Sequence, residues 1–230
     1  EDFYVTGSTF TYDNSPGTAT ISAPLDGRYY SSLTTLGGGS ADNVEVSTIS
    51  LSVQNTLGFC YSTGTLLFNN GCPGWFKAGG STNSWTYTFT GQPLAPDTQY
   101  IVYSSATDRA FNEQTAVSSV AFTYDVGRPT STVLTPNGYL NGTQAAIIGT
   151  AADSAAGIAS VEIALSSSST GAANTWWKID PSSGFTAGSA VYFSTDAAGG
   201  WNGLTWTWTR PINDYMMTGS TYTIRVKTRD

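Results

Sequence analysis

The 230-residue chain contains no histidine, and its charged residues amount to only 11% of the total. Without imidazole there is no Ser-His-Asp or Cys-His pair, no histidine-bound zinc and no imidazole general base. No Gly-x-Ser-x-Gly elbow occurs, and Gly37-Gly38-Gly39 is not followed by the lysine of a phosphate-binding loop. The aspartates fall mostly where turns and strand ends are expected. We therefore expect a protein that is not an enzyme.

Positive charge and long apolar runs are scarce as well. Nine Lys and Arg residues stand against 16 Asp and Glu, for a net charge of −7. No basic stripe is available to neutralise phosphates, so nucleic acid is not an expected partner. No run of about 20 apolar residues is present to span a membrane. An acidic surface rich in Ser and Thr is typical of extracellular and cell-surface proteins.

What the chain has in quantity is aromatic residues, at 13%, set among Ser, Thr, Gly and Asn. Such residues alternate with a period of two, which favours strands. Examples are Val46–Val53 and Trp85–Thr90 in the first half, with Ile158–Leu165 and Leu204–Thr209 in the second. No helical period persists for three turns. The pattern predicts an all-β fold of two tandem β-sandwich domains.

A short motif marks the repeat. Thr9-Phe10-Thr11-Tyr12-Asp13 returns, 112 positions later, as Ala121-Phe122-Thr123-Tyr124-Asp125, and a proline follows each copy within four residues. An aromatic-Thr alternation stopped by Asp and then Pro indicates the last strand of a domain running into a linker. We therefore assign residues 14–125 to domain 1 and residues 126–230 to domain 2. Residues 1–13 are expected to be a strand of a preceding or neighbouring domain.

The order of motifs carries a resemblance to a known family. Each half has a proline turn, a Leu/Ile-x-Gly segment, an aspartate, an alternating strand, a tryptophan and a Thr-x-Tyr strand ending in Asp, namely Asp108 or Asp230. This order resembles the bacterial Ig-like repeats of large surface adhesins and appendages. The resemblance implies Greek-key Ig-like sandwiches stacked into a rod on a cell surface, in some members with Ca²⁺ at the junctions. The Asp-x-Ala-Gly-Asn sequence of that family is altered here, because Phe111 replaces its glycine.

The repeat is broken at its far end. Domain 2 stops at Asp230, which aligns with Asp108, so it lacks the counterpart of the last strand of domain 1. Residues 1–13 match that missing strand, with apolar side chains at Phe3, Val5, Phe10 and Tyr12. A sandwich without its last strand exposes an edge that recruits another strand.

Three origins for the missing strand remain open. The chain is one period of a longer covalent array, or the segment is donated to domain 2 of the next copy. A fold-back onto the same chain is the least favoured, since the segment would have to cross the whole of domain 1.

The two cysteines, Cys60 and Cys72, are twelve positions apart across turn-forming sequence. We predict a disulfide that closes a local loop and stabilises the fold by about 3 kcal/mol. Two free thiols in a reducing compartment are the alternative.

Aspartates at strand ends are candidate ligands for Ca²⁺, which prefers six to eight oxygens. The first candidates are Asp13, Asp108 and Asp125, with Asp42, Asp153 and Asp230 as weaker ones. Simple capping of turns by aspartate explains the same positions. No cofactor is required under either interpretation.

Seven tryptophans raise the possibility of sugar binding, because flat rings stack on sugars. Trp85, Trp206 and Trp208 lie in period-two strands and are expected in the core. Trp176 and Trp177 are adjacent, so their side chains point to opposite faces and one is expected to leave the core. That ring would contact a glycan, another domain or another fibre.

Together these features predict a structural repeat unit of an extracellular fibre, stalk or adhesin. Its expected partners are further copies of itself, joined head-to-tail, and possible ligands are glycans or a host or neighbouring cell surface. The alternative is a carbohydrate-binding β-sandwich module of a secreted protein.

Overall fold

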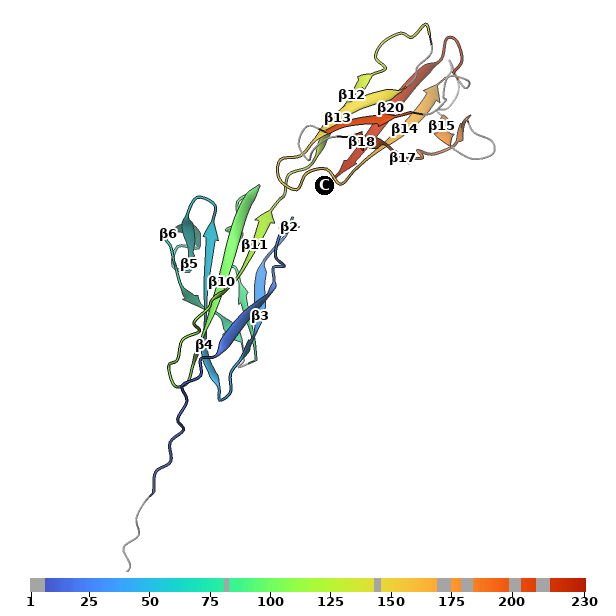
Figure 1. Ribbon diagram of the computed structural model, residues 1–230. Helices are drawn as coiled ribbons and strands as arrows, with labels where there is room; N and C mark the ends of the chain where they lie inside the picture. The colour runs from blue at the N-terminus through green and yellow to red at the C-terminus, as the bar shows by residue number, and fades with distance from the viewer. Residues whose placement is uncertain are drawn as a thin grey trace, which may run out of the picture. The chain divides into compact units, whose positions relative to one another are not determined.

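The computed structural model describes residues 7–80, 83–142, 146–168, 175–178, 184–198, 204–209 and 216–230. The described residues form strands and no helix, which confirms the all-β prediction. Contacts between Cα atoms divide the chain into unit 1, Glu1–Val126, and unit 2, Gly127–Asp230 (Figure 1). In the part of the chain that is described, no helix is long and apolar enough to cross a membrane.

Unit 1 is a sandwich of two sheets. The first has the order β1 (Thr18–Ala23), β3 (Thr35–Ala41), β9 (Ser84–Thr88), β8 (Gly79–Gly80). The second has the order β2 (Arg28–Tyr30), β11 (Ser118–Tyr124), β10 (Thr98–Asp108), β4 (Val46–Asn55), β5 (Phe59–Ser62), β6 (Leu67–Gly71), and β7 (Phe76–Lys77) also pairs with β4. Side chains from both sheets form one core, including Leu36 and Trp85 from the first and Tyr100, Val102 and Phe122 from the second. The period-two alternation of these strands places their apolar residues on the inner faces.

Unit 2 repeats this arrangement. One sheet has the order β12 (Thr130–Thr135), β13 (Ile147–Ala152), β19 (Leu204–Trp208), β18 (Asp196–Ala198). The other has the order β16 (Gly184–Ala187), β15 (Thr175–Lys178), β14 (Ser160–Ser168), β17 (Phe193–Ser194), and β20 (Thr221–Arg229) also pairs with β14. Its core contains Ile147 and Trp206 from the first sheet and Ile163, Leu165 and Trp177 from the second.

A tryptophan packed on a glycine anchors the first sheet of each unit. A side chain added at Gly38 would clash with the Trp85 ring and with the carbonyl of Thr20, and one added at Gly149 would clash with the Trp206 ring and the carbonyl of Thr132. Trp85 and Trp206 are both almost completely buried, as the sequence pattern predicts. The absence of Cβ at these two glycines therefore makes room for one fully buried tryptophan in each core.

A tyrosine hydroxyl fixes the turn before the long strand of each second sheet. The Ala95 N–H donates to the Tyr100 hydroxyl at 2.7 Å, and the Met217 N–H donates to the Tyr222 hydroxyl at 2.6 Å. This is the contact expected of a tyrosine corner, in which the hydroxyl holds a backbone segment five residues upstream. It orients β10 and β20 in the same way in the two units.

Candidate functional sites: an open sheet edge and an acidic cluster

The last strand of unit 1, β11, lies between two others. It pairs antiparallel with β10, so that Phe122 lies opposite Tyr100, and parallel with β2 on its other side. The rings of Tyr100 and Phe122 stack with their centroids 5.5 Å apart. Phe122 is 1% exposed and Tyr124 is 7% exposed. The second copy of the repeated motif is therefore part of the core.

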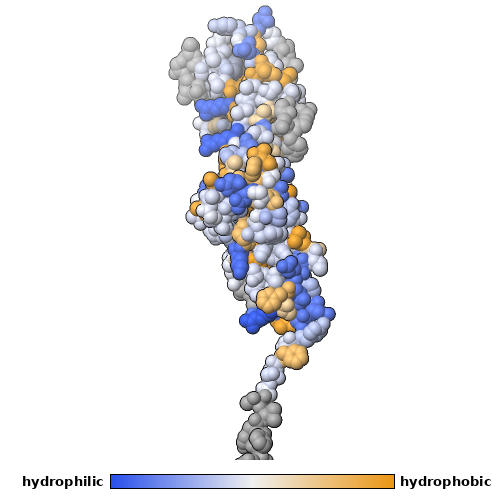
Figure 2. All heavy atoms as spheres, turned by 90° about the vertical axis from the view of Figure 1, so that its left-hand side faces the viewer, coloured by the Kyte–Doolittle hydropathy of each residue, from blue (hydrophilic) through white to orange (hydrophobic). Residues whose placement is uncertain are grey.

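The first copy of the motif has the opposite environment. Phe10 is 91% exposed and Tyr12 is 79% exposed, and residues 7–13 form no strand within this chain. In Figure 1 the segment leaves unit 1 without pairing, and in Figure 2 it carries hydrophobic (orange) surface. The expected strand is thus not formed here, because no neighbouring strand lies beside it to accept its backbone hydrogen bonds. Phe3 and Val5 lie outside the described residues.

One strand of unit 2, β20, has a partner on one side only among the described residues. β20 is the counterpart of β10, and it pairs with β14 on one side; on its other side no strand pairs with it among the described residues. The inward side chains of β10 at Tyr100 and Val102 are buried, whereas those of β20 at Tyr222 and Ile224 are only partly buried. A strand edge that has no partner among the described residues, next to a partly buried apolar stripe, has the features of a surface that accepts a further strand.

An acidic cluster lies at one end of unit 1. Carboxylate oxygens of Asp13, Asp42 and Asp108 all lie within 4.8 Å of one another. Asp13 ends the N-terminal segment, Asp42 directly follows β3, and Asp108 ends β10. These three elements converge because β3 and β10 finish at the same end of the sandwich.

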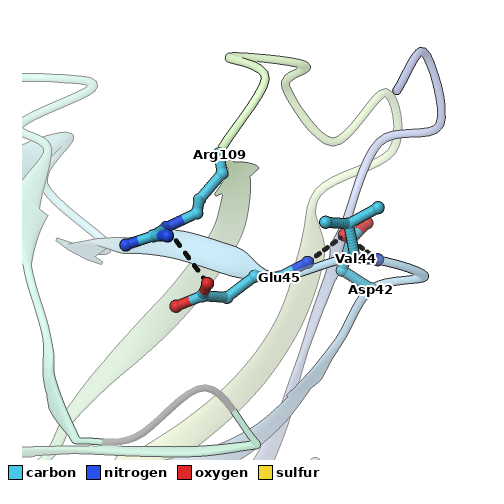
Figure 3. A network of polar contacts seen from close by, with 4 residues as sticks. All are labelled: Asp42, Val44, Glu45 and Arg109. Atoms are coloured by element: carbon cyan, nitrogen blue, oxygen red, sulfur yellow. Dashed lines mark hydrogen bonds and ion pairs between the residues drawn. The ribbon is translucent and has the colours of Figure 1, made fainter. Parts of the chain in front are cut away.

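Backbone and amide donors hold one side of this cluster. Asp42 Oδ2 accepts from the Val44 and Glu45 N–H groups, both at 2.8 Å (Figure 3). Asp13 Oδ1 accepts from the Asn43 side chain at 3.2 Å. The remaining oxygens, Asp13 Oδ2 and Asp42 Oδ1, are buried without a hydrogen-bond partner. Two unpartnered carboxylate oxygens beside a third carboxylate are suitable ligands for a hard cation.

Asn112 donates hydrogen bonds to two of the three aspartates, Asp108 and Asp13. Its backbone N–H and its side-chain amide donate to the two oxygens of Asp108, at 2.8 and 2.7 Å, and the amide also donates to the Asp13 carbonyl at 3.1 Å. Burial raises the pKa of Asp108, but these hydrogen bonds outweigh it and hold the pKa below its ordinary value. Arg109 points to Glu45, with Nε 3.1 Å from Oε2, rather than to Asp42 (Figure 3). Asp108 therefore keeps its negative charge at neutral pH.

The other candidate aspartates lie elsewhere. Asp125 is buried at the end of β11 and does not join Asp13 and Asp108. The reason is that β10 and β11 are antiparallel, so aspartates that end these two strands lie at opposite ends of the sheet. In unit 2, oxygens of Asp153 and Asp230, the counterparts of Asp42 and Asp108, lie within 4.8 Å of each other. Asp153 Oδ2 accepts from the Ala155 and Gly157 N–H groups.

Of the two adjacent tryptophans, Trp177 belongs to the core of unit 2 and Trp176 does not, as expected, but Trp176 is not exposed. Trp176 is 7% exposed and Trp177 is 3% exposed. Trp177 packs inward on Phe193 and Trp208, while the outer ring of Trp176 is covered by the guanidinium of Arg225, 4.6 Å from its centroid. Because β15 and β20 flank β14 on opposite sides, the long Arg225 side chain reaches across one strand to Trp176. Neither ring offers an open face to a sugar.

The predicted disulfide between Cys60 and Cys72 is confirmed. It ties β5 to the segment that follows β6, near the outer end of the second sheet of unit 1. A disulfide is compatible with an extracellular protein, since such bonds persist in oxidising compartments.

No protein-family model matches the chain, and no curated protein matches it. Among solved structures, it is similar to a tetra-tandem repeat in the extending region of a large adhesion protein, at 14% identity and a TM-score of 0.31, over 93% of this chain and 49% of that one. It is also similar to the alpha-L-rhamnosidase of Streptomyces avermitilis complexed with L-rhamnose, at 12% identity and a TM-score of 0.32, over 93% of this chain and 25% of that one. The chain thus spans about half and a quarter of the lengths of these two proteins.

Proposed function

We propose that this protein is a structural repeat unit of an extracellular fibre, stalk or adhesin. Its units join head-to-tail, either through β-strand complementation or through covalent tandem linkage. One observation carries the proposal: the same motif is buried in β11 of unit 1 and exposed at residues 9–13, while among the described residues β20 of unit 2 pairs only with β14. The role is mechanical rather than catalytic, and copies of the protein are its first partners.

Electron microscopy of the native material tests this function. We expect fibres with an axial repeat of about two domains. Isolated globules would contradict the proposal. A denaturing gel of the same material then distinguishes the two modes of linkage. A single band at the 24.2 kDa of this chain indicates strand complementation, whereas a ladder or one much larger band indicates a covalent array.

Within this function, we assign a Ca²⁺ site to Asp13, Asp42 and Asp108. Two buried carboxylate oxygens without a partner support the assignment, because an unpaired buried negative charge is costly and a cation would relieve it. The site would tie the root of the N-terminal segment to the end of unit 1, which would stiffen the point where that segment leaves.

Calorimetry of the full chain with Ca²⁺ and with a chelator tests the assignment. At free Ca²⁺ of about 100 times its dissociation constant, the ion should stabilise unit 1 by about 2.7 kcal/mol. Asp42→Asn should abolish the response, since it removes a charge but keeps an oxygen for the Val44 and Glu45 N–H groups. Asp97→Asn, at an exposed turn, is the matched control and should respond like the parent chain. An unchanged melting temperature in the parent chain would remove the Ca²⁺ site and leave the fibre proposal intact.

A further inference from the structure

We propose that a cleft between the two sheets of unit 1 binds an acidic saccharide, with Lys77 and Arg109 holding its carboxylate. The ring of Trp75 would stack on the neighbouring part of the sugar. The inference goes beyond the proposed function, because the cleft belongs to a single unit and would take its ligand whether or not copies of the protein join.

The cleft lies where the chain crosses from the second sheet to the first. The start of β4 lines it on one side, and β7 and β8 line it on the other. Its volume is about 330 Å³, which is within the range of small-molecule sites. β7 pairs with Ser50 and Leu51 of β4, and the Ala78 N–H donates to the Ile49 carbonyl at 2.9 Å. Among the described residues no strand pairs with this side of Val46–Thr48, so the cleft stays open there.

The lining of the cleft combines apolar and hydroxyl groups. Its buried members, Val46, Ile49 and Trp85, are apolar. Its more exposed members include the hydroxyl groups of Ser47 and Thr48 and the backbone of the two glycines of β8. A sugar offers C–H groups on its faces and hydroxyl groups at its edges. The lining therefore has the mixture of contacts that a sugar ring requires.

The charges at the cleft favour an anion, although the whole chain has a net charge of −7. Lys77 and Arg109 line the cleft, and Glu45 is the one acid among its described lining residues. Arg109 Nε lies 3.1 Å from Glu45 Oε2, and one end of the guanidinium points away from Glu45 (Figure 3). Lys77 is exposed and has no ion pair among the described residues. A guanidinium and an ammonium in one cleft are suitable donors for a carboxylate.

The acidic cluster of unit 1 does not occupy these cations. Asp42 lies on the far side of Glu45 from Arg109 (Figure 3), and its Oδ2 accepts from two backbone N–H groups. Asp13 and Asp108 do not line the cleft. A ligand in the cleft therefore meets two cations and one acid.

Trp75 extends the site along the segment that leads into β7. Trp75 is 44% exposed, and Lys77 is exposed as well. Between them Phe76 points inward, where its ring packs on Tyr61 and Tyr87. Residues two apart in an extended chain lie on the same face, about 7 Å from each other. The exposed ring and the ammonium group therefore face outward together, and the disulfide just before this segment restrains it.

A saccharide fits the cleft better than a peptide does. A peptide that binds by strand addition needs a long row of unpaired N–H and C=O groups. The unpaired side of β4 at the cleft comprises only Val46–Thr48. A sugar needs no such row, because each of its hydroxyl groups binds to a single side chain or backbone group.

Titration of the full chain with trigalacturonate tests the class of ligand, with binding followed by NMR in the presence of a chelator that removes Ca²⁺. The fully methyl-esterified trisaccharide is the matched neutral probe. We expect the acid to bind at least about tenfold more tightly than its ester, because only the acid has charges for the two cations. N-acetyl-triglycine, a peptide carboxylate, should bind at least about tenfold more weakly than trigalacturonate. Equal binding of acid and ester, binding of the peptide as tight as that of the sugar, or no binding of trigalacturonate would each overturn the inference.

Substitutions in the full chain test the location of the site. Lys77→Met and Arg109→Gln should each weaken the binding of trigalacturonate at least about tenfold. Arg28→Gln is the matched control, since it removes the same charge from an exposed position in β2, at the opposite edge of the same sheet. It should bind like the parent chain. An equal loss in Arg28→Gln, or no loss in Lys77→Met, would overturn the site.

Trp75→Ala separates stacking from charge. It should weaken the binding of trigalacturonate at least about threefold and leave the preference for the acid over the ester unchanged, because stacking does not depend on the carboxylate. Unchanged binding would remove Trp75 from the site and overturn that part of the inference. None of these titrations depends on whether the native material forms fibres, so the inference and the proposed function can fail separately.

Discussion

Unit 1 completes one of its sheets with β11, whereas the corresponding sheet of unit 2 ends at β20 among the described residues. The two units otherwise share their strand order, a tryptophan packed on a glycine and a tyrosine that holds the turn before the long strand. The difference is therefore confined to one edge. The shared core pattern therefore does not depend on the strand that borders this edge in unit 1.

The largest expected difference in stability is between substitutions at Phe122 and at Phe10. Phe122→Ala should destabilise unit 1 by about 3–5 kcal/mol, because it removes a fully buried ring from the core. Phe10→Ala in the dispersed single chain should change stability by less than about 0.5 kcal/mol, because that ring is exposed. Calorimetric melting of each variant measures both effects. Similar losses from the two substitutions would show that the two copies of the motif have equivalent environments and break the comparison.

The second-largest difference in stability between the units is expected from the disulfide. Reduction, or the double substitution Cys60→Ser with Cys72→Ser, should destabilise unit 1 by about 3 kcal/mol through the freedom gained by its unfolded loop. Unit 2 contains no cysteine, so its transition should not move. Chemical denaturation followed in oxidised and reduced protein measures the two transitions. Equal shifts in both would mean that the units do not unfold independently.

Gly38 and Gly149 test what the units have in common. Gly38→Ala and Gly149→Ala should each destabilise their own unit by about 1–3 kcal/mol, because the added methyl group meets a buried tryptophan ring and a backbone carbonyl. Gly142→Ala, where nothing lies within 4 Å, is the control and should be nearly neutral. Thermal melts of the three variants measure these losses of stability. A large loss at only one of the first two glycines would show that the shared packing is not equivalent.

The tyrosine turn should give the smallest effect. Tyr100→Phe and Tyr222→Phe should each cost about 0.5–1.5 kcal/mol, since each removes one hydrogen bond to a backbone N–H. Burial raises the pKa of Tyr100 above its ordinary value. Its contribution is therefore complete below pH 10 and is lost as the pH rises through the pKa of the folded state. Melting between pH 8 and 11 should show a weaker alkaline decline in Tyr100→Phe, and an unchanged decline would contradict the role of burial.

Much of the architecture could be predicted from periodicity, because the alternation of apolar residues depends on local geometry alone. The strand around Trp85, the strand around Trp206 and the pairing of Cys60 with Cys72 are found as predicted. The acidic cluster could be predicted only in part. Asp42 was the weaker candidate and Asp125 the stronger, yet Asp42 lies beside Asp13 and Asp108 while Asp125 does not. Strand order and direction decide which strand ends meet, and a single sequence does not reveal them.

Trp176 illustrates the same limit. Its neighbour Trp177 enters the core, so the two-residue period of a strand places Trp176 on the opposite face. The sequence contains no local signal that Arg225, far along the chain, covers that face from across β14. A buried outer face of this kind depends on which strands flank β14.

The all-β class, the twofold repeat and the duplicated motif can be recognised without a structure, because each is a pattern of residue types along one chain. The tertiary structure alone decided that one copy of that motif is buried against Tyr100 and that the other is exposed. The two copies have nearly the same residues, so their own chemistry cannot distinguish them. What distinguishes them is the neighbouring strand, since a β-strand gains its hydrogen bonds and buries its apolar face only against a partner.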